Sequence, residues 1–122
     1  MTEKAFWVFL KMAIAVKGRV NQVSGCMDSD EQNVNENGRY IGGHSVLFNG
    51  YDGLSEDRIE EIGGLLFDPS VASQAKEAIL MILAHYPKKV ALDILRKYNK
   101  NPDKELRYYA KTALWECHMW NE

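Results

Sequence analysis

Three histidines and two cysteines are the residues of this chain whose side chains most often carry catalysis or bind metal ions. They are His44, His85 and His118, with Cys26 and Cys117. The sequence contains no HExxH, CxxC or GxSxG motif, the spacings that bring such side chains together. Adjacent residues of a helix point about 100° apart, so Cys117 and His118 are badly placed to share one ion. The sequence therefore predicts no enzyme, no metal site and no cofactor.

Two of these residues have local surroundings that can be interpreted. His44 lies between Gly43 and Ser45, in a glycine-rich segment. It is either a binding group presented by a loop or a histidine that completes a turn. Cys117 falls in the apolar stripe of the last predicted helix, so we expect it to pack as a small hydrophobic side chain rather than act as a nucleophile.

Charge is distributed unevenly along a chain whose net charge is only −2. A total this small gives no long-range attraction to nucleic acid or to membranes. Residues 25–38 contain four acids and no base, and acids also gather at the start of a predicted helix after Ser55. Such clusters are either solvated helix faces or a surface for a basic partner. The acids that we expect to contact a partner are Asp28, Asp30, Glu31, Glu36, Glu56, Asp57, Glu60 and Glu61.

Aromatic residues are frequent in the last predicted helix. Tyr108 and Trp115 point off its buried stripe, and aromatic side chains outside a core are typical interface anchors. The alternative is that residues 1–53 fold back and cover them. The same region is basic, and a nucleic-acid-binding face would use Tyr98, Tyr108, Lys97, Lys104, Arg107 and Lys111. Because Asp103 and Glu105 interrupt these bases, binding to nucleic acid is the less favoured alternative.

The elements that must position these side chains are helices. Residues 2–17 predict an amphipathic helix that is too short and too charged to span a bilayer, with a signal peptide as the less favoured alternative. The two cysteines are far apart and in no paired spacing, which suits a reducing compartment, so we expect a cytoplasmic protein. Residues 28–38 predict an exposed loop. Residues 39–53 are rich in glycine and predict a short helix between turns, with a hairpin as the alternative. After Ser55, which is a good N-cap, apolar spacing predicts four helices to the end of the chain. Asp68 and Asn101 are predicted to cap the second and the fourth of these helices, each with the following proline at the first helical position.

The second half of the sequence repeats itself. Residues 68–80 read DPSVASQAKEAIL, and residues 103–115 read DKELRYYAKTALW. Ala75 matches Ala110 and Ala78 matches Ala113, while Lys76 matches Lys111. A pair of short helices cannot bury both apolar faces alone, so a second stacked copy would complete one core.

These repeated segments resemble HEAT repeats. RIEEIGGLLFDPSVASQAKEAILMIL and ALDILRKYNKNPDKELRYYAKTALWEC share that family's apolar first helix, turn with proline, and second helix with spaced alanines. Arg107 after Leu106 fits the family's arginine, whereas Ala72 after Val71 departs from it. The resemblance implies a single all-α domain of residues 1–122. It would be a short HEAT-like α-solenoid of antiparallel helix pairs, with two repeats in 54–122 and an atypical N-terminal capping region in 1–53.

The resemblance also implies a function of binding rather than catalysis. HEAT-like proteins are usually scaffolds that bind other proteins. A small helical protein with uneven charge is similar to the immunity proteins of bacterial toxin systems. We therefore expect an inhibitor that neutralises a cognate toxin, with nucleases as one class of target, by occluding its active site with acidic residues. The alternatives are a nucleic-acid-binding protein that uses the basic C-terminal helices and a scaffold subunit of a larger complex.

Overall fold

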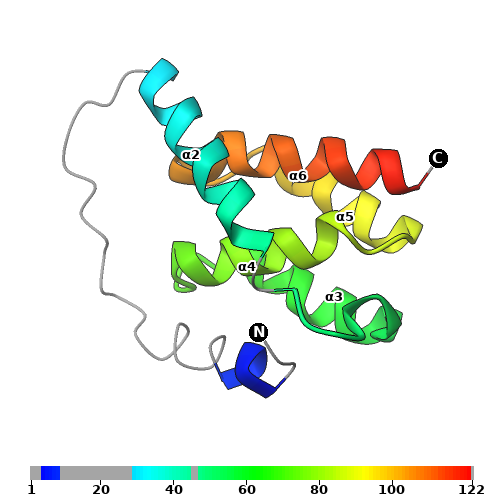
Figure 1. Ribbon diagram of the computed structural model, residues 1–122. Coiled ribbons are helices and arrows are strands. Elements are labelled where there is room, and N and C mark those ends of the chain that lie inside the picture. Colours follow the sequence, from blue (N-terminus) through cyan, green and yellow to red (C-terminus); the bar gives the residue numbers. More distant parts are fainter. Residues whose placement is uncertain (1–3, 9–28, 45–46, 122) are drawn as a thin grey trace.

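The computed structural model describes residues 4–8, 29–44 and 47–121, except the side chains of residues 29 and 30 (Figure 1). Helices dominate, and no strand occurs within these ranges, which confirms the all-α prediction. Residues 4–8 are helical, and they are the described part of the helix predicted over 2–17. The α-helices that follow are α2 (Ser29–Gly43), α3 (Glu56–Gly64), α4 (Ser73–Ala84), α5 (Lys89–Asn99) and α6 (Arg107–Trp120). Short 3-10 turns precede or follow them: η2 (Tyr51–Gly53), η3 (Leu65–Phe67) and η4 (Lys104–Leu106).

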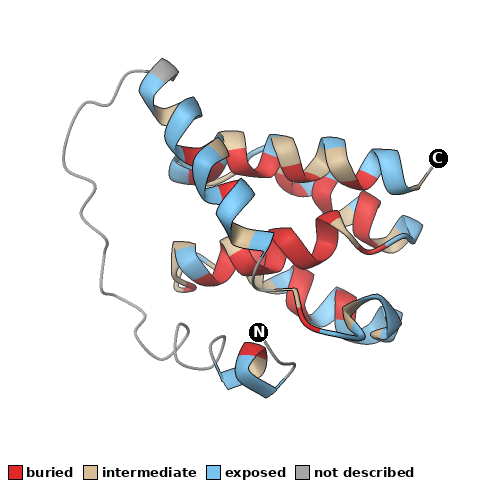
Figure 2. Cartoon of the chain, viewed as in Figure 1, coloured by how far each residue is buried: buried red, intermediate tan, exposed pale blue. Residues whose placement is uncertain are grey.

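Helix α4 forms the centre of the core. Its last seven residues, 78–84, are all buried, and Figure 2 shows this burial along most of the helix. Helices α5 and α6 both pack against α4, and α3 packs against α5 (Figure 1). Because α4 is apolar on every side of its second half, it must be enclosed by other helices. Helix α2 lies across α6 and α4 and covers the remaining side.

Residues 29–43 form a helix, so the prediction of an exposed loop over 28–38 is wrong for the described part. The segment is polar and has no apolar stripe, because its large aliphatic residues, Val34 and Ile41, are both exposed on the outer face of α2. The inner face instead buries Glu36 and Tyr40. At the end of this helix, a Cβ atom on Gly43 would come within 2.6 Å of the Tyr109 hydroxyl oxygen. The absent side chain therefore lets α2 approach α6 closely.

The predicted start of α3 is confirmed, since the Ser55 hydroxyl accepts a hydrogen bond of 3.2 Å from the Arg58 backbone N–H. The predicted starts of α4, at Asp68, and of α6, at Asn101, are wrong. Asp68 does not cap α4. Its carboxylate accepts bonds from the backbone N–H and hydroxyl of Ser70, and α4 begins only at Ser73. Likewise the Asn101-Pro102 break is followed by η4, and α6 begins at Arg107.

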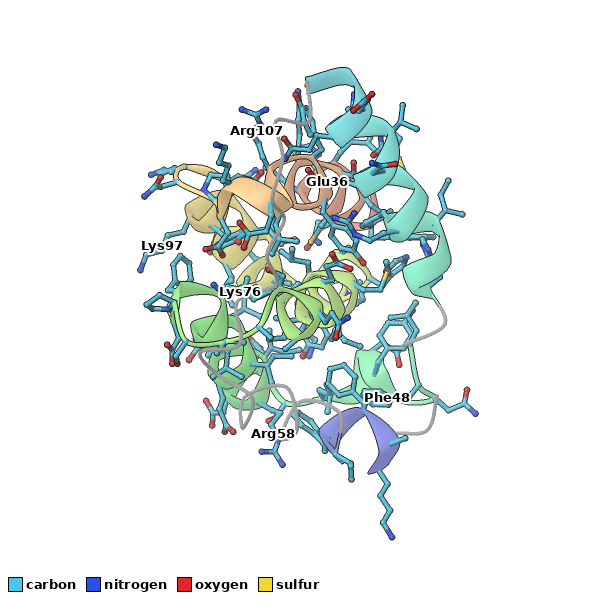
Figure 3. All side chains as sticks on the ribbon, turned by 90° about the vertical axis from the view of Figure 1, so that its left-hand side faces the viewer. Glu36, Phe48, Arg58, Lys76, Lys97 and Arg107 are labelled. Carbon is cyan, nitrogen blue, oxygen red and sulfur yellow. The ribbon has the colours of Figure 1, made fainter. Side chains whose placement is uncertain are left out.

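The repeated alanines occupy equivalent buried places. Ala75, Ala78, Ala110 and Ala113 are all at most 1 % exposed, on α4 and α6, which pack together. The repeated lysines differ. Lys111 is exposed, whereas the Lys76 side chain is 4 % exposed and its Nζ lies 2.7 Å from Asp103 Oδ2. Figure 3 shows Lys76 in the interior of the molecule.

Residues 4–8 pack against Phe48 and against Arg58 at the start of α3. Phe6 is fully buried, with its ring centroid 5.2 Å from that of Phe48. The Arg58 guanidinium lies 4.6 Å from the centroid of the Trp7 ring, below α3 in Figure 3. The described helices include none with the length and apolar content needed to cross a bilayer.

Candidate functional site

Glu36 was predicted to contact a partner, but the structure shows it to be a buried structural residue. Only 1 % of the Glu36 surface is exposed to solvent. Oε1 accepts hydrogen bonds from the backbone N–H groups of Tyr108 at 2.8 Å and Tyr109 at 2.9 Å. Both N–H groups lie in the first turn of α6, where backbone donors have no partner within the helix itself. The N-cap residue of α6, Leu106, supplies no side-chain hydrogen bond to them. Glu36 therefore caps α6 from a different helix, as its position in Figure 3 shows.

The other predicted acids divide into two groups. Asp28 lies outside the described residues, and the Asp30 side chain is also not described; Glu31 is exposed on α2. All four acids of α3 are exposed: Glu56, Asp57, Glu60 and Glu61. We call these four residues the acidic surface of α3. At 3.6 residues per turn they fall within an arc of about 140°, and the apolar Ile59 and Ile62 lie outside it.

The two aromatic residues predicted as anchors lie seven residues apart on one side of α6. Trp115 is 65 % exposed, so no described part of the chain covers it. Tyr108 is half-buried, and the Arg107 guanidinium lies 4.8 Å from its ring centroid. An exposed tryptophan and a partly exposed tyrosine on the same side of one helix are residue types that interfaces favour.

The alternative basic face is only partly assembled. Lys97, Lys104, Arg107 and Lys111 are all exposed. Tyr98, however, is buried, and its hydroxyl donates a hydrogen bond to Asp103, so it offers no ring to a nucleic-acid base. Lys97 is already 5.2 Å from the centroid of the Phe67 ring. The tyrosine expected at this face is therefore a core residue.

A cluster that sequence spacing did not predict joins His44, His85 and Glu116. One donor atom from each lies within 4.8 Å of the other two. His44 follows the end of α2, His85 is the C-cap residue of α4, and Glu116 lies on α6. The Nε2 atom of His85 is 3.0 Å from Glu116 Oε2, and the Nε2 atom of His44 is 3.7 Å from Oε1. The two imidazole rings are edge to face, with centroids 4.9 Å apart.

Main-chain carbonyls orient both rings of the cluster. His44 Nδ1 lies 3.1 Å from the carbonyl oxygens of Tyr40 and Ile41, and His85 Nδ1 lies 2.9 Å from that of Met81. A carbonyl oxygen only accepts hydrogen bonds, so each Nδ1 carries the proton. In the neutral ring, Nε2 then carries a lone pair, and both Nε2 atoms face Glu116.

Two tyrosines border this cluster. The Tyr40 hydroxyl donates a short hydrogen bond to Glu116 Oε1. Burial, and then the bond to the Glu116 carboxylate, raise the pKa of Tyr40, so its hydroxyl keeps the proton that it donates. Tyr51 packs its ring edge to face against His85, with centroids 6.3 Å apart. Burial and the charges of Asp52 and Glu116 raise the pKa of Tyr51 as well.

The sequence contained one weak signal for this cluster, the glycine next to His44. His85 and Glu116 gave none, because they stand in different helical segments and their meeting depends on how α2, α4 and α6 pack. Compared with known proteins, the chain matches no family model, no curated protein and no solved structure.

Proposed function

We propose that this protein is a binding module that inhibits a partner protein by placing the acidic surface of α3 in a basic cleft. The observation that carries the proposal is the exposure of four carboxylates on a nine-residue helix whose one base is Arg58. Arg58 offsets only one of the four charges, since its guanidinium pairs with Glu61 at 3.3 Å and stacks on Trp7. Four acids and one base leave the helix with a net charge of −3.

The target class follows from the charge. Enzymes that cleave nucleic acid bind phosphates, so their clefts are basic, and a row of carboxylates can occupy such a cleft in place of the phosphates. Opposite charges also accelerate encounter and exclude wrong partners. We therefore propose a toxin-neutralising immunity protein of the cytoplasm, with a nuclease domain as its target.

The packing of the second half is compatible with a short HEAT-like α-solenoid, which we propose as its architecture. The equivalent helices of the two predicted pairs touch, α3 with α5 and α4 with α6. Stacked helix pairs in such proteins expose one long face for binding a partner. Trp115 would then add an aromatic anchor at a second contact region.

The test begins with co-expression of the tagged protein and the proteins encoded next to it, followed by purification of the complex. Association with the purified partner is then measured by surface plasmon resonance at low and at moderate salt. The test variant is Glu56→Lys with Glu60→Lys, two acids of α3 that lie one turn apart. The matched control is Asp52→Lys with Asp93→Lys, which makes the same charge change at exposed acids outside α3.

We expect the α3 variant to lower the association rate constant at least tenfold at low salt, and the control to change it less than twofold. Nuclease activity of the partner should be blocked by the wild-type protein and restored with the α3 variant. Equal effects of both variants would reject the acidic surface as the binding site. Recovery of nucleic acid that dissociates with salt, and of no protein, would instead favour Lys97, Lys104, Arg107 and Lys111.

A further inference from the structure

We infer that His44, His85 and Glu116 form a binding site for one divalent transition-metal ion, with zinc as the preferred occupant. The inference is independent of the proposed inhibitor function. Two imidazoles and one carboxylate are a ligand set that zinc uses when three protein groups bind it. Neutral rings with an ionised carboxylate carry one negative charge, which suits a doubly charged cation.

The distances within the cluster are close to those that zinc requires. Zinc–nitrogen and zinc–oxygen bonds of about 2.0–2.1 Å place the ligand atoms of a tetrahedral site about 3.3–3.4 Å apart. His85 Nε2 and Glu116 Oε2 are 3.0 Å apart, and His44 Nε2 is 3.7 Å from the same carboxylate. All three donor atoms lie within 4.8 Å of one another, so small side-chain rotations bring them to one ion.

The outer contacts are those that metal-binding histidines usually have. A histidine ligand generally donates its second ring N–H to a carbonyl or carboxylate, which fixes the tautomer and directs the other nitrogen to the metal. His44 and His85 both do this through Nδ1, toward the carbonyls of Tyr40 or Ile41 and of Met81. Tyr40 plays the same role for the carboxylate, because it donates to Glu116 Oε1 and leaves Oε2 toward His85.

A simple ion pair explains less of this geometry. One protonated histidine would suffice to balance Glu116, yet two rings converge on the carboxylate and stand edge to face at 4.9 Å. If both rings were protonated, two positive charges would lie in contact beside one carboxylate. A metal ion accounts for both rings, since the Nε2 lone pairs of two neutral rings and the Glu116 carboxylate can all bind one charged centre.

The site also has access to solvent. The His44 side chain is 42 % exposed, whereas those of His85 and Glu116 are 8 % and 17 % exposed. Three protein ligands leave one position of tetrahedral zinc open. Because His44 is exposed, a water molecule or a donor atom from a partner can reach the cluster and complete the coordination.

The test is isothermal titration of the metal-free full chain with zinc chloride, with magnesium chloride as the negative titrant because Mg²⁺ prefers oxygen ligands. The variants are His44→Ala, which removes an exposed ring, and Glu116→Gln, which keeps an acceptor for Tyr40. The control is His118→Ala, an exposed histidine two residues from Glu116 and on the opposite side of α6. Circular dichroism checks that each variant is folded.

We expect one zinc ion per chain, no response to magnesium, and a loss of zinc affinity of at least tenfold in both His44→Ala and Glu116→Gln. Zinc should raise the melting temperature of the wild-type protein and of His118→Ala, but not that of His44→Ala. Absence of zinc binding by the wild-type chain would overturn the inference. So would an equal loss of affinity in His118→Ala, because the ion would then be held by scattered surface histidines.

Discussion

Replacement of Glu36 by alanine tests whether this acid is a cap for α6 or a contact for a partner. Its Oε1 atom accepts two backbone hydrogen bonds, from Tyr108 at 2.8 Å and Tyr109 at 2.9 Å. Hydrogen bonds to a charged group are worth about 1.5–3 kcal/mol each, so the two together contribute about 3–6 kcal/mol. Water entering the space left by the side chain recovers part of this. We expect Glu36→Ala to lower the free energy of unfolding by about 3–4 kcal/mol.

A conservative variant separates the charge of Glu36 from its shape. Glu36→Gln keeps one oxygen acceptor but loses the negative charge beside the positive end of the α6 dipole, a term of up to about 2 kcal/mol in buried geometries. We expect it to cost about 1–2 kcal/mol. Glu31→Ala is the matched control, because it removes an exposed acid from the same helix and should change stability by about 0.5 kcal/mol or less.

These differences are measured by urea unfolding, followed by far-ultraviolet circular dichroism, which reports helix content. The free energy of unfolding is extrapolated linearly to zero denaturant. A small domain is stable by about 5–15 kcal/mol, so the expected loss in Glu36→Ala is easily resolved. A loss below about 1 kcal/mol, or an equal loss in Glu31→Ala, would refute the capping role. Unchanged stability together with loss of partner binding would return Glu36 to the binding surface.

Two further predictions concern buried groups of α4 and α6. Lys76→Met should lower the free energy of unfolding by about 1–3 kcal/mol in urea titrations, because it removes the ion pair between the buried Lys76 and the half-buried Asp103. Lys111→Met, at the exposed repeat position, should change it by less than about 0.5 kcal/mol, and equal costs would contradict the prediction. Burial raises the pKa of the Cys117 thiol from 9.0 to about 11, so the stability of the folded protein falls as the pH rises through this interval. In a Cys26→Ser background, iodoacetamide should alkylate Cys117 far more slowly in the folded protein than in the urea-unfolded protein. Equal alkylation rates would show that the thiol is accessible.

Local patterns predicted the second half of the chain well. The four helices after Ser55 were expected from apolar spacing, and Cys117 was expected in the last buried stripe, where it is fully buried. The helix starts were less accurate. Asp68 has the side chain and neighbouring proline of a cap, but it closes a turn with Ser70 because the chain must bend before α4 begins.

Helix α2 could not be predicted from its own residues. Its sequence lacks an apolar stripe, and its two large aliphatic residues, Val34 and Ile41, are exposed. Contacts with α6 hold α2 in place. Backbone N–H groups of α6 donate hydrogen bonds to Glu36, and the Tyr109 ring packs against Tyr40 with centroids 5.0 Å apart. An acid that reads as solvent-exposed is buried here because a helix terminus elsewhere in the chain provides its partners.

The sequence by itself determined that the chain is helical, that four helices follow Ser55 and which of their faces are apolar, since these properties depend on spacing within about four residues. The tertiary structure alone decided the fate of individual polar side chains. It buried Glu36 and Lys76, left the acids of α3 in solvent, and brought His44, His85 and Glu116 together from three elements. The physical reason is that the burial and the partners of a polar group depend on which other helices approach it, and no local pattern encodes that approach.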